Sequence, residues 1–182
     1  MHPQLQEIRD DFERASRRLD ALAARVPPGA WFTRPGPGRW SPGECVAHLN
    51  LTSTRFLPVV REALGRTPRL PSGDAARRLR RDPLGWFLWR IMPPPVRGMR
   101  VKAKPDFTPP ADGDPDALLA EFARLQADQL DCLAAADGLA LDRTMIVSPI
   151  DSRARYNLFA CFGILPRHQH RHLWQAERAS AQ

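Results

Sequence analysis

Apolar positions recur at steps of three and four over several long stretches of the chain, which is the spacing of one helix face. In residues 3–25 they form one stripe, with charged residues between them. Residues 115–137 follow Asp114, a typical N-cap residue, and stop before Gly138, a typical helix stop. Residues 83–92 are a shorter apolar stretch that ends at three prolines. We therefore predict two long helices and one short accessory helix here.

The clearest helix start in the chain is the segment WSPGE. Ser41 suits an N-cap, a proline follows at the first helical position, and Glu44 completes a capping box. Trp40 is expected to pack back over the first turn, as in a hydrophobic staple. The helix should run to Gly65, with a kink at Pro58. Its predicted inner stripe comprises Cys45, His48, Leu49, Thr52, Phe56 and Val60.

A fourth long helix is predicted from about Tyr156 to Arg178. Residues 26–40 and 96–113 are rich in proline and glycine and lack a helical period, so they should be irregular connections. In the connection before the last helix, only TMIV, residues 144–147, reads as extended. Four helices of about 20 residues predict an all-α fold, a four-helix bundle with long crossover connections and a short accessory helix. At 182 residues, one domain over 1–182 is expected.

Positive charge is concentrated in the middle of the chain. The formal net charge is +7, and residues 66–104 contain 11 lysines and arginines but only two acids. This segment is either a solvated cationic loop or a surface that attracts an anionic substrate, an acidic partner or nucleic acid. No nucleic-acid-binding module is recognisable, so nucleic acid is the least favoured partner.

Cysteine use and hydropathy point to a cytoplasmic protein. The three cysteines are widely spaced and form no CxxC, so we expect small core residues rather than disulfides. No apolar run approaches the length of a transmembrane helix, and the N-terminus has no signal-peptide pattern. No membrane partner is therefore expected.

Three of the five histidines lie within RHQHRHLWQ, in the last predicted helix. His168 and His172 are i, i+4, so their side chains lie about 40° apart around the helix and about 6 Å along it. That spacing lets one helix face offer two imidazoles to one cation. His170 lies about 160° from that pair and should point away, towards solvent. A solvated basic helix end is the alternative interpretation of the pair.

A third ligand has to come from elsewhere, and His48 is the candidate. It lies one turn into the second helix, on the face expected to point inwards. A lone histidine on an apolar face is more often a hydrogen-bonded core residue than a ligand. Together with His168 and His172, however, it would complete a set of three neutral imidazoles with an open fourth position. Such a set suits Zn²⁺, Ni²⁺ or Fe²⁺.

Three segments resemble one known family, the DinB-like superfamily. They are RWSPGECVAHLNLTSTRF, GMRVKAKPDFTPP and RHQHRHLWQAERA, and the similarity covers about residues 1–180. The resemblance implies a four-helix bundle with a divalent-metal site, in which His48, His168 and His172 match the ligands. Characterised relatives include thiol-dependent transferases and a mycothiol-dependent maleylpyruvate isomerase, in which the metal activates a low-molecular-weight thiol for attack on an electrophile. Members are often homodimers.

The departure from the family pattern is Pro166, which should kink the last helix one turn before His168. Gln175, Thr52 and Glu44 are further candidates to line or support the site, although Glu44 already has a capping role. The leading hypothesis is a metal-dependent enzyme that acts on a small electrophilic substrate. A bundle that binds metal or ligand without turnover, and a protein whose basic segment docks on an acidic partner, are the alternatives.

Overall fold

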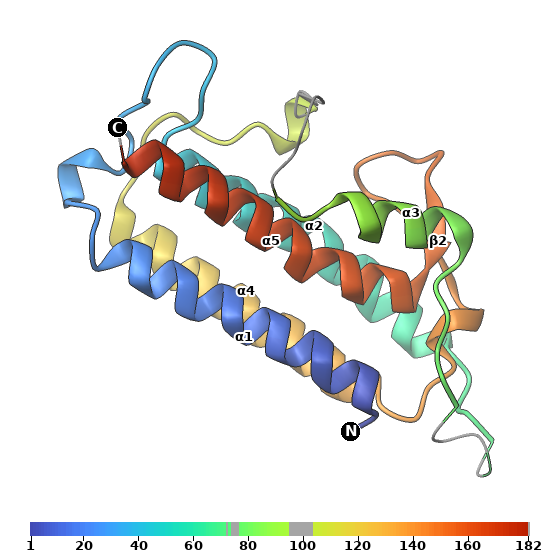
Figure 1. The fold of residues 1–182 in the computed structure, drawn as a ribbon. Coiled ribbons are helices and arrows are strands. Elements are labelled where there is room, and N and C mark those ends of the chain that lie inside the picture. Colours follow the sequence, from blue (N-terminus) through green and yellow to red (C-terminus); the bar gives the residue numbers. More distant parts are fainter. Residues whose placement is uncertain (72, 74–76, 95–103, 182) are drawn as a thin grey trace.

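The computed structural model describes residues 1–71, 73, 77–94 and 104–181. The predicted crossover over 96–113 and the basic segment over 66–104 therefore lie partly outside the described residues. The described part is mostly helical (Figure 1). Its elements are α1 (Pro3–Ala23), η1 (Pro28–Ala30), α2 (Pro42–Arg66), α3 (Pro83–Ile91), η2 (Pro105–Phe107), α4 (Pro115–Ala135), η3 (Leu141–Arg143), β1 (Met145–Val147), β2 (Arg155–Asn157) and α5 (Leu158–Ser180).

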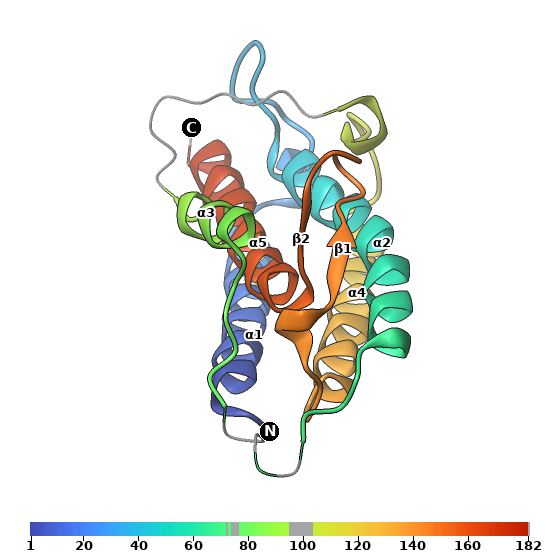
Figure 2. The ribbon, with the colours of Figure 1, turned by 90° about the vertical axis from the view of Figure 1, so that its right-hand side faces the viewer.

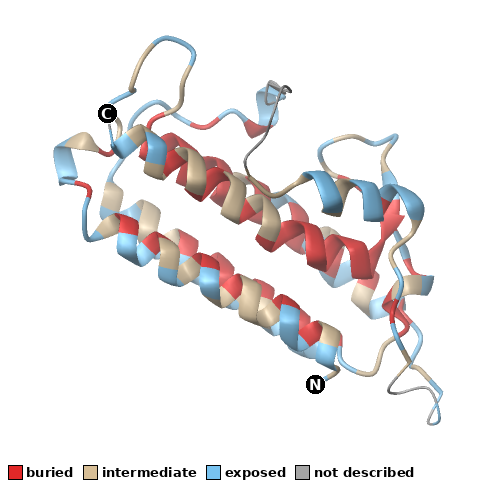
Figure 3. Ribbon diagram, in the orientation of Figure 1, coloured by how far each residue is buried: buried red, intermediate tan, exposed pale blue. Residues whose placement is uncertain are grey.

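The four long helices lie side by side, and each packs against two others. Helices α1 and α2 both pack against α4 and α5, while the short α3 crosses the outside of α5 (Figures 1 and 2). Buried residues lie mainly on the parts of the helices that are turned towards one another (Figure 3). The two predicted stripes are confirmed, because all of their members are buried. They are Leu5, Ile8, Phe12, Ala15, Leu19 and Leu22 on α1, and Cys45, His48, Leu49, Thr52, Phe56 and Val60 on α2.

The prediction of an all-α fold is wrong at one point, because β1 and β2 form a small antiparallel sheet. The expected extended piece is one strand, and its partner begins at Arg155. Ile146 pairs with Tyr156, and both side chains are buried against the core. The last helix consequently begins at Leu158 rather than at Tyr156. Asn157, the last strand residue, is also the N-cap, since its side chain accepts a hydrogen bond from the backbone N–H of Ala160.

The two prolines inside helices do not interrupt them. Helix α2 is continuous through Pro58, and α5 is continuous through the buried Pro166. His168 and His172 therefore lie on one uninterrupted helix, whose regular i, i+4 geometry is retained. No helix in the described part of the chain combines the length and the apolar character needed to cross a membrane.

Candidate metal centre

The three histidines that the sequence singled out come together between α2 and α5. One ring nitrogen from each of His48, His168 and His172 lies within 4.8 Å of the other two. The ring centroids of His48 and His172 are 4.4 Å apart, and those of His168 and His172 are 4.5 Å apart. His48 and His172 are buried and His168 is half-buried, so His168 is the most accessible residue of the group. Three ring nitrogens gathered in this way could hold a metal ion.

A backbone contact fixes the orientation of His48. Its Nδ1 lies 2.7 Å from the carbonyl oxygen of Phe107, in the short helical turn η2. A carbonyl only accepts hydrogen bonds, so Nδ1 carries the proton and Nε2 keeps a free lone pair. Metal-ligating histidines commonly have this arrangement, in which the remaining N–H is held by a carbonyl. The unprotonated Nε2 of His48 is therefore available to bind a metal ion.

His172 carries an unsatisfied buried atom. Its Nδ1 is buried and has no hydrogen-bond partner within the described residues. The indole of Trp40 covers this side of the group, with centroids 5.0 Å from His48 and 5.9 Å from His172. Burying a polar atom without a partner costs free energy. A metal ion bound to His172 would offset this cost, so His172 also fits the role of a metal ligand.

Burial lowers the pKa of all three histidines. For His48 the carbonyl of Phe107 partly opposes this effect, because it stabilises the protonated ring. For His168 and His172, the other histidines and Arg171 lower the pKa further through charge repulsion. Near neutral pH the group is therefore three uncharged imidazoles, the form that binds metals. No carboxylate or thiol of the described residues joins it.

The three additional candidates have different surroundings. Gln175 interacts with the ring of His172 and favours its protonated form. The hydroxyl of Thr52 donates to the backbone carbonyl of His48 at 2.8 Å, so it stabilises the helix next to the site. Glu44 is fully buried in the predicted capping box, where its carboxylate accepts from the N–H of Ser41 at 2.9 Å.

Glu44 also pairs with Arg34 from the loop before α2, whose Nε donates to it at 2.9 Å. Burial alone would raise the pKa of Glu44. The hydrogen bonds from Arg34 and Ser41 outweigh burial and hold that pKa below its usual value. Glu44 is consequently a structural anion whose oxygens are already engaged, which leaves little capacity for proton transfer at the histidines.

One sequence expectation near the site needs correction. His170 does point away from the group, but it is half-buried rather than solvated: its Nε2 contacts the backbone carbonyl of Asp11 on α1 at 3.2 Å. Trp40, which the sequence predicts over the first turn of α2, also packs on His48 and His172.

Sequence reasoning also missed the contact from Phe107, which lies 59 residues after His48. The only available signal was that Phe107 falls within one of the three segments that carry the family resemblance.

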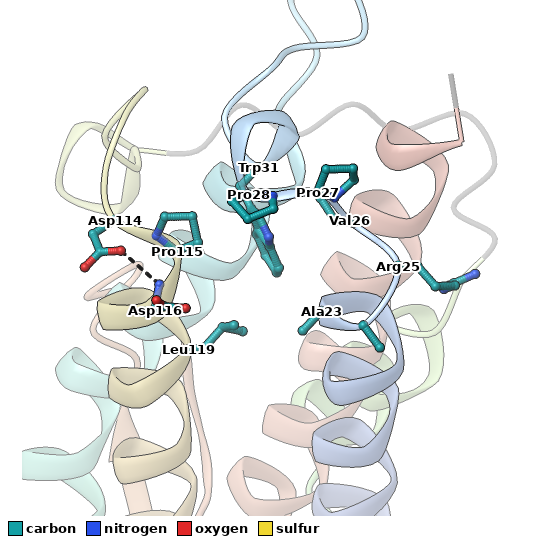
Figure 4. A pocket seen from close by; sticks show the side chains of 11 residues that line it. Ala23, Arg25, Val26, Pro27, Pro28, Trp31, Asp114, Pro115, Asp116 and Leu119 are labelled. Atoms are coloured by element: carbon teal, nitrogen blue, oxygen red, sulfur yellow. Dashed lines mark hydrogen bonds between the residues drawn. The ribbon is translucent and has the colours of Figure 1, made fainter.

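A cavity of about 480 Å³ lies elsewhere, between the end of α1 and the start of α4 (Figure 4). Residues 23–28, Trp31, residues 114–116 and Leu119 line it, so it contains none of the three histidines. The carboxylate of Asp114 accepts a hydrogen bond from the N–H of Asp116 as the cap of α4. This cavity therefore lies where the end of α1 meets the start of α4, and none of the residues that line it belongs to the histidine group.

Comparison with known proteins agrees with the geometry of the site. No curated protein and no solved structure matches the chain. The family described as the DinB superfamily matches residues 11–176, a span that includes α2, η2, most of α5 and all three histidines. The chain belongs to the DinB superfamily.

Proposed function

We propose that the protein is a divalent-metal-dependent enzyme that uses His48, His168 and His172 to hold the ion and transfers a low-molecular-weight thiol, or water, to a small electrophilic substrate. The observation that carries the proposal is the convergence of three neutral imidazoles with no carboxylate among them. A divalent ion held there would act as a Lewis acid, lowering the pKa of a bound thiol or water and polarising the electrophile. Zinc, nickel and iron all accept this donor set.

The chain's own residues supply orientation and exclusion of water. The carbonyl of Phe107 keeps His48 in the tautomer that presents Nε2. Trp40 covers the buried side of the group, so a reactant has to approach beside the half-buried His168. Gln175, next to His172, is proposed to orient that imidazole. The architecture that we propose for this function is a four-helix bundle of α1, α2, α4 and α5 in a single domain, residues 1–182.

We also propose a homodimer, as the family resemblance implies. Its support is the exposure of four large apolar side chains on α3: Leu84, Trp86, Phe87 and Ile91. Exposed apolar side chains gathered on one short helix are typical of protein–protein contacts.

The test of the site is metal analysis of protein purified without a histidine tag. The wild type should contain about one equivalent of a divalent metal, and His48→Ala and His172→Ala should each lose most of it. His170→Ala is the matched control, because it removes a histidine of α5 that lies outside the group, and it should retain the metal. Near-stoichiometric metal in both His48→Ala and His172→Ala would refute the assignment.

A protein that binds metal or ligand without turnover is the second candidate. The observation that favours it is that the described residues place no free acid or base at the group, since Glu44 is engaged by Ser41 and Arg34. The two candidates differ in one measurement on the metal-loaded protein. Conjugation of thiols to electrophiles, lost in His172→Ala, would support the enzyme, and bound metal without conjugation across the panel would support the binding protein.

A further inference from the structure

Two arginines alternate with the histidines along α5. Arg167 precedes His168 and Arg171 precedes His172, so the arginines are also i, i+4 and share one side of the helix. Arg167 is already engaged by α3, where its guanidinium lies 3.6 Å from the ring of Trp89 and its Nη1 donates to the carbonyl of Trp89 at 3.2 Å. Arg167 therefore serves mainly to attach α3 to α5.

Arg171 has no such engagement. It is half-buried, yet it forms no hydrogen bond, ion pair or ring contact with any other described residue. Burial is the only cause of the lowered pKa of its guanidinium, so no described carboxylate compensates its charge. Arginines that are removed from water are normally paired, because an uncompensated charge is costly to bury. Arg171 is thus a partly desolvated cation whose five N–H donors are not engaged by any described residue.

The position of Arg171 relates it to the histidines. It is next to His172 in the chain and three residues after His168, a spacing that brings Cβ atoms to about 5–6 Å. Its charge lowers the pKa of both histidines. Arg171 consequently lies within one helical turn of both histidines on α5, on the helix that also carries His168, the more accessible residue of the group.

The described groups at the histidines, namely the three imidazoles and the guanidinium of Arg171, are neutral or positively charged. The imidazoles are uncharged, the guanidinium is a cation, and no described carboxylate belongs to the group. A divalent ion would add two further positive charges. A ligand that compensates them carries a second anionic group besides its thiolate, and a carboxylate matches the planar fork of a guanidinium with two parallel hydrogen bonds.

We propose that Arg171 binds the carboxylate of the ligand at the histidine group, and that the protein therefore selects small thiols that carry a carboxylate. This inference rests on the proposed function, since it requires the thiol to bind at the metal. It makes Arg171 a specificity-determining residue, distinct from the three residues that hold the ion.

The test measures thiol binding to untagged protein loaded with Co²⁺, through the thiolate-to-cobalt charge-transfer absorption. The probes are 3-mercaptopropionate, which carries a carboxylate, and 2-mercaptoethanol, which is neutral. The two thiols differ in acidity, and this difference affects their binding in the same way in every protein variant. The measured quantity is therefore the ratio of the two dissociation constants in each variant. When this ratio is compared between variants, the difference in acidity cancels. The Arg171→Gln variant removes the charge and keeps a polar, although shorter, side chain.

In the wild type the ratio should favour 3-mercaptopropionate, and Arg171→Gln should reduce that preference about tenfold. Arg171→Lys should keep part of it, because the charge remains without the bidentate fork. Arg178→Gln is the matched control, an exposed arginine of the same helix whose guanidinium lies 5.2 Å from the ring of Trp174. It should leave the ratio unchanged.

The outcomes separate this inference from the function on which it rests. A ratio that is unchanged in Arg171→Gln, or reduced equally in Arg178→Gln, would overturn the inference while leaving the metal site intact. Failure of cobalt to bind to the wild type would refute the proposed function and the inference together. Circular dichroism of each variant shows whether a lost preference reflects lost folding, and Arg171→Lys provides a second, milder substitution.

Discussion

The stability of the metal-free protein should fall steeply as the pH is lowered from 7.5 to 5.5. The folded state holds His48, His168 and His172 with pKa values below the ordinary 6.5, chiefly because of burial. The unfolded chain exposes the same imidazoles to water and takes up protons around pH 6.5. The unfolded state thus binds more protons than the folded state in this range, so the free energy of unfolding decreases as the pH falls.

The size of the effect has an upper limit. A histidine that stays neutral when folded and titrates normally when unfolded lowers the free energy of unfolding by about 1.4 kcal/mol between pH 7.5 and 5.5. Three such histidines would give at most about 4 kcal/mol, a large part of the usual 5–15 kcal/mol of a domain. Carboxylates contribute little in this window, because Asp11, Glu44 and Asp142 have pKa values lowered from ordinary values near 4.

The assay is urea unfolding in the presence of a chelator, followed by far-ultraviolet circular dichroism at both pH values. The variant His172→Gln removes one buried imidazole and should reduce the pH-dependent loss by up to about 1.4 kcal/mol. The control His170→Gln removes a histidine that packs on α1 and should leave the contribution of the group in place. If the wild type and His172→Gln lose the same free energy of unfolding between the two pH values, the argument from burial is wrong.

Two further predictions concern the elements around the site. Glu44→Gln should lower the free energy of unfolding by about 1–2 kcal/mol in urea unfolding at pH 7.5, because it removes the charge that accepts from Ser41 and Arg34 at the start of α2; an unchanged midpoint would show that this charge contributes nothing to stability. Gly85→Ala should destabilise the protein by about 1–3 kcal/mol in thermal unfolding, since the new Cβ would overlap the Cβ of Ala160 where α3 meets α5. Gly65→Ala, with open space around the new Cβ, is its control and should be neutral or slightly stabilising.

Most of the local structure could be predicted from the sequence, because its causes lie within one or two helical turns. The stripe on α1, the capping box of Ser41 and Glu44 and the cap at Asp114 are all interactions between residues at most four apart in the chain or along one helix face. The pairing of His168 with His172 follows from helix geometry in the same way. The predicted boundaries of these helices differ from the structure by only a few residues.

The sequence failed where a partner is distant in the chain. It indicated an extended segment before the last helix but not that Ile146 pairs with Tyr156, because nothing local specifies the partner of a short strand. For the same reason His170 was expected in solvent, although α1, more than 150 residues away, provides the carbonyl of Asp11.

The sequence by itself therefore determined the helices, their buried faces and the identity of the three histidines that could meet. Only the tertiary structure decided that His48 is held by the carbonyl of Phe107, that Trp40 packs on His48 and His172, and that no described carboxylate pairs with Arg171. The physical reason is that helix periodicity and capping are local properties of the backbone. Hydrogen bonding and the compensation of charge depend instead on which side chains the packing of distant segments brings together.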